Sequence, residues 1–492
     1  MQVLAVDIGT TRLKAGRLDL EGRLHRLAVR AIPLIQDGTG RAEHDPEAVW
    51  EQFVAAAREA AEGGAPAVRW LVLSTYQLGL LPVDGEGRPL MGLMTLLDTR
   101  PRETFPGLLA RMDPQDLYRR TGCPPVFQYP LAKLEWLRAR RPEIFRAARW
   151  FLGLKDFLLL RLIGRPVTEP SLATATQLMN VHTLRWDPEA LALVDLSAER
   201  LPEVVPPEAR LGPLRPEAAA ALGLGAAVEV IAGVYDGGAV GLGLGALVPG
   251  VGAMNLGTTA MIRVAADRPL LDGSPRMRLQ TYYLAQGRWF PGAALSNAGL
   301  VLRWLQDVLG RRDAAPEALA EAEPTDLLFL PFLAGERYPG ISHQASGVLF
   351  GLQAYHGPGH LVRAAMEGVA FGMRLILEAL RENGLAPLRL RAGGGGARSA
   401  LWMRILASVL GVPVEVPEVP EPALLGGVQV VRLALGMEDA MASLPPTPFR
   451  RYEPVSEWVP VYAHRFAAFQ ALLADLEAAF RRHGFGTQPL SG

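Results

Sequence analysis

Cysteine and lysine are scarce in this chain of 492 residues. The single cysteine, Cys123, excludes an internal disulfide and any zinc site built on several cysteines. This composition suits a reducing compartment. The N-terminal segment also lacks the layout of a secretory signal. We therefore expect a cytoplasmic protein.

Lysine occurs at only three positions, Lys14, Lys133 and Lys155, while arginine fills every other basic position. Lysine is a compact point charge, whereas arginine is a planar fork that needs more room. Two interpretations remain open. Some of these sites cannot accept arginine, or coding bias left three lysines by chance.

Neither sign of charge dominates, since 50 basic residues balance 50 acidic ones and the formal net charge is zero. Nothing here indicates a nucleic acid or an anionic membrane as partner. The longest uncharged stretch, residues 237–262, could span a bilayer by length, but it is rich in glycine and contains Pro249 and Asn255. We interpret it as a buried helix, a turn and a strand.

Strand patterns alternate with helical patterns along the whole chain, which is typical of an α/β protein. Hydrophobic residues make up 49% of the chain, and its length predicts two domains. A proline-rich stretch at 201–216 ends one compositional block, and the apolar run VEVIAGVYD begins the next. We therefore predict domains at residues 1–229 and 230–492.

A strand that ends in an acid leads into a Gly-Thr-Thr turn at DIGTT (7–11), and the pattern returns at NLGTT (255–259). Glycine permits close approach of the backbone, and the N–H groups and threonine hydroxyls suit phosphate oxygens. Asp7 could hold Mg²⁺, which prefers oxygen ligands, while Asn255 in the second copy avoids repelling phosphates. Either turn alone could be a plain hairpin. Their repetition predicts two turns that grip a polyphosphate.

Asp236 follows an apolar run and precedes glycines that open a helix. At the carboxyl end of a strand, where α/β proteins bind ligands, it could accept a hydroxyl proton as a general base. It could also simply cap the helix. Further on, LRLRAGGGGARS places four glycines after a strand, at 393–396. A flat ligand such as adenine would explain them, and so would a loose connection.

These motifs, in this order, resemble the FGGY family of carbohydrate kinases, and the resemblance covers nearly the whole chain. The first family signature, around PLAKLEWL at 130–137, is only partly met. The matching segments are DIGTT (7–11), YDGG (235–238), NLGTT (255–259), LAGERYP (333–339), GVLFGLQAYHGPGHLVRAAME (347–367) and GGGARS (394–399).

The resemblance implies two actin-like (ribonuclease H-like) domains with nucleotide and substrate in the cleft between them. It also implies transfer of the γ-phosphoryl group of ATP to a sugar hydroxyl, with Asp236 as the catalytic base and Asp7 at Mg²⁺. The residues implied to bind the nucleotide are Gly9, Thr10, Thr11, Lys14, Gly257, Thr258, Thr259, Gly394, Gly395, Gly396 and Arg398.

Within the family, several stretches look most like gluconokinase and then xylulokinase, but the sugar-binding region departs from both. Gln77 and Leu78 stand where a Met-His pair is usual, and Leu96 stands where a tryptophan is usual. Asp98 is retained to accept hydrogen bonds from hydroxyls, and Arg100 to pair with a carboxylate of a sugar acid. The residues predicted to contact the substrate are Tyr76, Gln77, Asp98, Arg100, Asp236 and Asn297, the last of which could instead cap a helix.

The predicted function is that of an ATP-dependent kinase acting on a sugar, a polyol or a sugar acid, with gluconate as one candidate. A xylulokinase-like or other polyol kinase is an alternative. The altered sugar region also leaves open a catalytically weak sensor of nucleotide or metabolite. Glu336 and Arg337 are expected to form a buried ion pair that braces the cleft. A homodimer is left open.

Overall fold

The computed structural model describes residues 1–248, 250–339, 341–342, 344–418, 421–437 and 448–483. Its first sheet comprises β1 (Gln2–Ile8), β2 (Arg12–Asp19), β3 (Leu24–Ala31), β6 (Val68–Thr75), β14 (Arg210–Pro213) and β15 (Glu229–Tyr235). These strands lie in the order β14-β15-β6-β1-β2-β3. The hairpin of β1 and β2 and its extension to β3 are antiparallel, whereas β1, β6 and β15 run parallel.

The second sheet comprises β16 (Val251–Leu256), β17 (Ala260–Val264), β20 (Gly292–Leu295), β23 (Arg389–Gly393), β24 (Val414–Pro417) and β25 (Phe449–Tyr452). Its order is β20-β17-β16-β23-β24-β25. Again the first three strands are antiparallel, and β16, β23 and β24 run parallel. The two sheets therefore share one topology, with a Gly-Thr-Thr turn in the first hairpin of each. This confirms the predicted α/β fold of two related domains.

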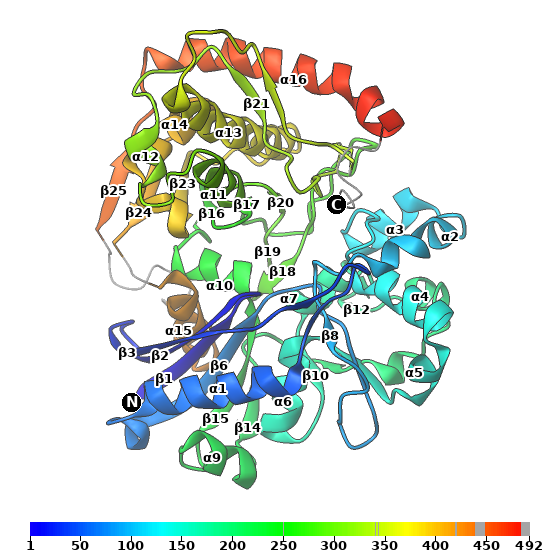
Figure 1. Ribbon diagram of the computed structural model, residues 1–492. Coiled ribbons are helices and arrows are strands. Elements are labelled where there is room, and N and C mark those ends of the chain that lie inside the picture. Colours follow the sequence, from blue (N-terminus) through cyan, green and yellow to red (C-terminus); the bar gives the residue numbers. More distant parts are fainter. Residues whose placement is uncertain (249, 340, 343, 419–420, 438–447, 484–492) are drawn as a thin grey trace.

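The predicted division at 229/230 needs correction, because β15 belongs to the first sheet. It pairs in parallel with β6 and antiparallel with β14. Figure 1 shows this green strand among the blue strands of the lower sheet. The proline-rich stretch before it marks loops around β14 rather than the end of a domain. A division after α10 (Asp236–Gly243) keeps the first sheet whole.

Two helices, α10 and α15 (Pro422–Ala434), lie between the sheets and join the domains (Figure 1). Glycines allow the helices to touch, because a Cβ at Gly243 would lie 1.8 Å from the carbonyl oxygen of Pro422, and one at Gly426 would lie 1.9 Å from that of Ala239. One apolar cluster combines side chains of both helices with side chains of both sheets. The cleft between the domains thus has a closely packed floor.

Helices also cover the outer faces of both sheets. On the first sheet these are α1 (Pro46–Ala61), α6 (Leu154–Ile163) and α9 (Pro216–Leu222). On the second sheet they are α13 (Pro358–Glu382), α14 (Ala400–Leu410) and α16 (Trp458–His483). In the described part of the chain, no helix combines the length and the apolar character needed to cross a membrane. The uncharged stretch at 237–262 forms most of α10, then β16 and the start of β17.

The remaining helices lie outside the two large sheets, and most of them belong to the segment of the chain between β6 and β15. They are α2 (Phe105–Leu109), α3 (Pro114–Thr121), α4 (Pro130–Arg140), α5 (Pro142–Ala147), α7 (Pro170–Ala173), α8 (Pro188–Ala192), α11 (Gly299–Val308) and α12 (Pro316–Leu319). Both domains also contain short strands outside the two large sheets. These are β4 (Ile35–Gln36), β5 (Ala42–His44), β7 (Leu81–Val83), β8 (Leu93–Met94), β9 (Trp150–Leu152), β10 (Val167–Thr168), β11 (Met179–Asn180), β12 (Arg185–Trp186), β13 (Glu203–Val204), β18 (Tyr283–Ala285), β19 (Arg288–Trp289), β21 (Leu328–Leu330) and β22 (Val348–Phe350).

Candidate active site

In both Gly-Thr-Thr turns the glycine N–H closes the turn, although the two turns differ in length. In the first, the N–H of Gly9 donates to the carbonyl oxygen of Arg12 over 2.9 Å, and in the second that of Gly257 donates to Thr259 over 2.9 Å. The second turn closes one residue earlier than the first. The repeated sequence therefore builds a repeated structure at the facing ends of the two hairpins.

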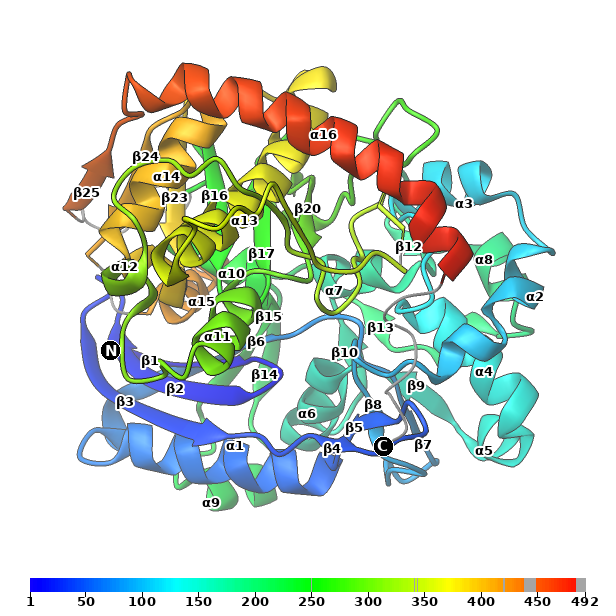
Figure 2. The same cartoon turned by 45° about the horizontal axis from the view of Figure 1, so that its top comes forward.

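A cavity of about 570 Å³ lies where the two turns meet the glycine-rich segment. Residues of α11 and α12 line it opposite Thr11 and Arg12 of the first turn, and Figure 2 shows where α11 lies relative to β1 and β2. The predicted residues that line it are Thr11, Gly257, Thr258, Gly395, Gly396 and Arg398. The structure thus brings together, from three distant segments, residues that the sequence predicts for one nucleotide site.

The wall of this cavity also contains residues that the sequence patterns did not indicate. Arg303 and Gln306 come from α11, and the Arg303 guanidinium donates to the Thr258 hydroxyl over 3.1 Å. Trp402, at the start of α14, donates from its indole to the carbonyl oxygen of Met366 over 3.1 Å. These residues share no short motif, and only the fold places them together.

The glycines of the glycine-rich segment have packing reasons as well. At Gly394, φ is +88° and a Cβ would lie 2.5 Å from the carbonyl oxygen of Leu256. Gly394 lines a neighbouring cavity of about 430 Å³ together with Lys14. The Lys14 ammonium pairs at 2.6 Å with Glu421, the residue directly before α15. Lys14 therefore lies outside the larger cavity and ties β2 to α15.

Two half-buried carboxylates, Asp7 and Asp236, lie at the carboxyl ends of β1 and β15. Asp7 accepts a hydrogen bond from the Ser74 hydroxyl over 2.7 Å, and burial raises its pKa to about 6. Asp236 is the first residue of α10 and accepts from the N–H of Gly237 over 2.7 Å. Burial and the nearby charge of Asp7 raise the pKa of Asp236 to about 7. An acid poised in this range can act as a base near neutral pH.

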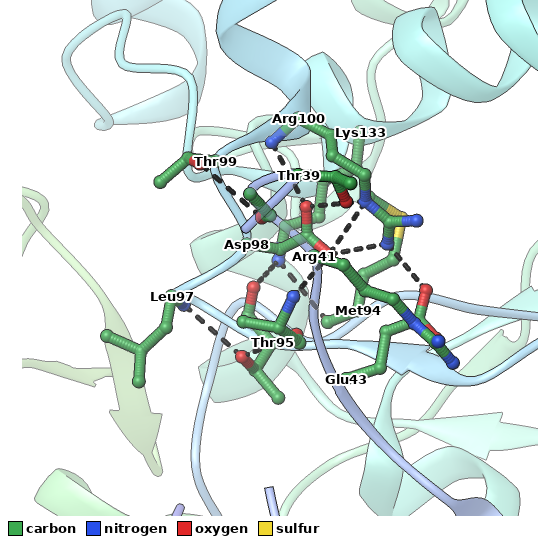
Figure 3. Close-up of polar contacts among 12 residues, drawn as sticks. Thr39, Arg41, Glu43, Met94, Thr95, Leu97, Asp98, Thr99, Arg100 and Lys133 are labelled. Carbon is green, nitrogen blue, oxygen red and sulfur yellow. Dashed lines mark hydrogen bonds and ion pairs between the residues drawn. The ribbon is translucent and has the colours of Figure 1, made fainter. Parts of the chain in front are cut away.

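Asp98 and Arg100 belong to a cluster of hydrogen bonds and ion pairs that also includes Glu43 (Figure 3). Asp98 is fully buried, and its two oxygens accept from the N–H of Ala42 over 3.2 Å, from the N–H of Arg100 over 3.1 Å and from the Arg100 guanidinium. The same guanidinium pairs with Glu43 and stacks 4.5 Å above the Trp136 ring. These donors occupy lone pairs of the carboxylate and hold Asp98 and Arg100 in place, and contact of either residue with the substrate stays a prediction.

Three other predicted substrate residues have partners within the protein. The Tyr76 hydroxyl lies 2.7 Å from Nδ1 of His44, and the amide of Gln77 donates to the carbonyl oxygen of Ser171 over 3.2 Å. Asn297 is fully buried and donates to the carbonyl oxygen of Gly335 over 2.6 Å. Gln77 alone of these three side chains is partly exposed.

Burial raises the pKa of Glu336, and the charge of Arg337 acts against this as a smaller effect, so the expected ion pair of the two residues stays a prediction. Glu336 accepts from the backbone N–H groups of Ser296, Arg337 and Tyr338, which fixes this loop. Within the described part of the chain, Nε of Arg337 is buried and has no hydrogen-bond partner. Burial and the charge of Asp7 raise the pKa of Asp236, and the Gly237 N–H lowers it. The charge of Arg337 also lowers this pKa, by a smaller amount. Arg337 is therefore a cation near this carboxylate.

Fold and site together define a two-domain phosphotransferase: two sheets of one topology, a turn from each at a shared cavity, and a carboxylate of raised pKa at the carboxyl end of β15. The sequence belongs to the FGGY family of carbohydrate kinases. The model of the family's N-terminal domain matches residues 2–243, and that of its C-terminal domain matches residues 252–434. The chain is accordingly a carbohydrate kinase that transfers a phosphoryl group to an alcohol, and kinases of this kind use ATP as the donor.

Several known proteins are similar over most of their length. Gluconokinase of Bacillus licheniformis is 30% identical over 455 residues, with 89% of this chain and 88% of that protein covered. Xylulose kinase of Escherichia coli K12 is 28% identical over 476 residues, with 95% and 96% covered. A solved gluconate kinase from Lactobacillus acidophilus superposes with a TM-score of 0.92 at 26% identity, covering 98% of this chain and 99% of that one.

Proposed function

We propose that this kinase transfers the γ-phosphoryl group of Mg-ATP to a hydroxyl group of a sugar acid, with gluconate as the first candidate. The proposal rests on two observations: a cavity lined by both Gly-Thr-Thr turns, and two half-buried carboxylates, Asp7 and Asp236, of which the first raises the pKa of the second. Similar proteins named gluconokinase and gluconate kinase support the choice of acceptor. Its single cysteine, which is buried, supports a cytoplasmic location.

Asp236 is the base in this proposal. It takes the proton of the acceptor hydroxyl as that oxygen forms a bond to the γ-phosphorus, and the bond from the γ-phosphorus to the leaving oxygen of ADP breaks. The turn donors of Thr11 and Thr258 hold the phosphates, and Gly257 lets the backbone come close to them, so that little reorganisation is needed during transfer. Gly395, Gly396 and Arg398 lie along the nucleoside part of the cavity.

Asp7 is the residue proposed to hold Mg²⁺. In the described residues no cluster of three or more acidic, histidine or cysteine side chains could hold a metal. A single carboxylate completed by water and phosphate oxygens is nevertheless an ordinary Mg²⁺ site. When bound, Mg²⁺ offsets the negative charge of the phosphates. The raised pKa of Asp7 fits this assignment, because a buried carboxylate without a cation favours its protonated form.

Arg337 supports an acidic acceptor. Arg100, the cation first expected to recognise a carboxylate, pairs with Asp98 and Glu43 instead. Arg337 has an unpartnered, buried Nε and lies near enough to Asp236 to influence its pKa. A guanidinium can bind a carboxylate through two parallel N–H donors. The same end of the cleft could serve an uncharged ketose, as the xylulose kinase relative suggests.

A panel of acceptors tests this function. ADP release from Mg-ATP is measured with gluconate, xylulose and glycerol, and without acceptor. We expect kcat/KM for gluconate to exceed the others by at least about tenfold, the effect of ~1.4 kcal/mol. Arg337→Met should raise KM for gluconate far more than KM for any weaker acceptor. A dominant response to xylulose would favour the second candidate. Silence across the panel with ATP binding intact would favour the sensor.

The pH dependence of turnover tests Asp236 as the base. The acid must lose its proton to act, so kcat/KM for the acceptor should rise about tenfold per pH unit on the acid side and level off near pH 7, following the pKa of about 7. Adding Mg²⁺ should move the midpoint to lower pH, because it neutralises Asp7, whose charge raises the pKa of Asp236. A profile that stays flat from about pH 5 to about pH 8 would contradict the assignment of Asp236 as the base.

A further inference from the structure

His44, at the end of β5, lies between the first Gly-Thr-Thr turn and the strand end that carries Tyr76. The side chain is fully buried. Its Nε2 lies 3.1 Å from the carbonyl oxygen of Thr10, and its Nδ1 lies 2.7 Å from the Tyr76 hydroxyl. The next residue, Asp45, caps α1 by accepting from the N–H of Glu47 over 2.9 Å, which fixes the backbone around the histidine.

The two partners of His44 decide its tautomer. A carbonyl oxygen can only accept, so Nε2 carries the proton and donates it to Thr10. Nδ1 is then the acceptor, and the Tyr76 hydroxyl donates to it. Burial lowers the pKa of His44 to about 4, so the ring stays neutral at physiological pH. The chain Tyr76–His44–Thr10 therefore has one hydrogen-bonding arrangement near neutral pH.

This arrangement sets the direction of a phosphate-facing peptide group. In a trans peptide unit the carbonyl and the following N–H point in opposite directions. Since the Thr10 carbonyl is directed at His44, the N–H of Thr11 is directed away from it. Thr11 lines the cavity that Gly257 and Thr258 also line. The histidine thus turns a donor of the first turn away from the protein core.

We propose that His44 is a positioning residue for the first phosphate-binding turn, and that Tyr76 holds its ring in the required tautomer. The inference rests on the proposed function only in taking this turn to bind phosphate groups. It also explains why Tyr76, which the sequence predicted to contact the substrate, is buried, with only 3% of its surface exposed. A bond from Tyr76 N–H to the carbonyl oxygen of Ile8 over 2.9 Å ties the same two segments again.

Two amide variants separate positioning from mere packing. Glutamine at this position places its N–H₂ near the site of Nε2, whereas asparagine is shorter and reaches only the site of Nδ1. His44→Gln therefore keeps the donor to Thr10, and His44→Asn keeps only the contact with Tyr76. Both variants remove the ring and leave a polar amide in the same buried space, so each serves as the matched control of the other.

The affinity for Mg-ADP, measured by titration calorimetry, and KM for Mg-ATP are the readouts. We expect His44→Asn to weaken both roughly tenfold, while His44→Gln stays within about threefold of the parent and KM for the acceptor changes little in either. Equal losses in both variants, or no loss in either, would overturn the proposal. If His44→Asn fails to unfold cooperatively, Tyr76→Phe, which leaves the ring free to change tautomer, should weaken Mg-ADP binding about threefold. An unchanged affinity of Tyr76→Phe for Mg-ADP would also count against the positioning role of His44.

Binding of Mg-ADP does not require turnover. If no sugar is ever phosphorylated, a selective loss in His44→Asn would still support the positioning role, and the proposed function would fail alone. If gluconate is phosphorylated and the two variants behave alike, the positioning role fails alone.

Discussion

Asp236→Asn is expected to abolish phosphoryl transfer while nucleotide binding stays nearly unchanged. Asparagine has almost the same shape and can still accept the Gly237 N–H through its oxygen, but it cannot take a proton. Loss of a general base typically lowers turnover by about 10²–10⁴-fold. Acceptor-dependent ADP release gives the rate, and calorimetry with Mg-ADP gives the affinity.

Asp113→Asn is the matched control for this variant. Asp113 caps α3 and accepts from the N–H of Gln115 over 2.9 Å, so it too is an aspartate at the start of a helix. Asparagine serves equally well as a cap. Turnover of Asp113→Asn should match that of the parent. If Asp236→Asn also turned over within a few-fold of the parent, another residue would have to be the base.

The second large effect is expected on stability, when the buried pair of Lys155 and Glu169 is broken. The Lys155 ammonium lies 2.6 Å from a Glu169 oxygen, and both side chains are fully buried. Lys155→Met leaves the carboxylate buried without a counter-charge, which costs ~3–5 kcal/mol of the free energy of unfolding. Chemical denaturation followed by tryptophan fluorescence measures the loss.

A double variant tells whether the pair itself matters. Lys155→Met with Glu169→Leu removes both charges, so it should lose clearly less than the sum of the two single variants. Glu169 also accepts a hydrogen bond from the Ser171 hydroxyl over 2.8 Å. The hydroxyl oxygen of Ser171 in turn accepts from the N–H of Tyr235 over 2.9 Å. The pair therefore supports the strand end before Asp236. A loss below ~1 kcal/mol in Lys155→Met would show that the pair is dispensable.

The scarcity of lysine in the sequence led to a hypothesis that the structure supports at two of three positions. Lys155 is enclosed beside Glu169, and Lys133 is fully buried and donates to the carbonyl oxygens of Leu78, Met94 and Thr95. A compact ammonium suits such a three-carbonyl site better than a planar guanidinium. Lys14, half-exposed beside Glu421, shows no such constraint.

The sequence predicted well whatever depends on neighbouring residues. The two turns and the strand before Asp236 follow from short local patterns, and the family resemblance then supplied the pairing of the domains. The membership of β15 in the first sheet depends on its pairing with β6, more than 150 residues earlier. A change in composition at the proline-rich stretch could not reveal that pairing.

Side-chain partners were the least predictable feature. Asp98 looked available for hydroxyl groups because its motif was intact, but Ala42, 56 positions away, occupies one of its oxygens. The role of His44 could not be predicted, because a lone histidine in a polar stretch indicates no function until the fold brings Thr10 and Tyr76 into contact with it. The signal that could have directed attention to it was its place directly before a helix cap, in a segment that the fold must fix.

The most direct test of the account is to follow ATP, Mg²⁺ and gluconate with the purified chain by ³¹P NMR. We expect the γ-phosphate signal to disappear while ADP and a new phosphomonoester signal grow in equal amounts, and we expect neither change without acceptor. Release of inorganic phosphate at the same rate with and without gluconate, or no loss of ATP with any sugar acid, polyol or ketose, would contradict it.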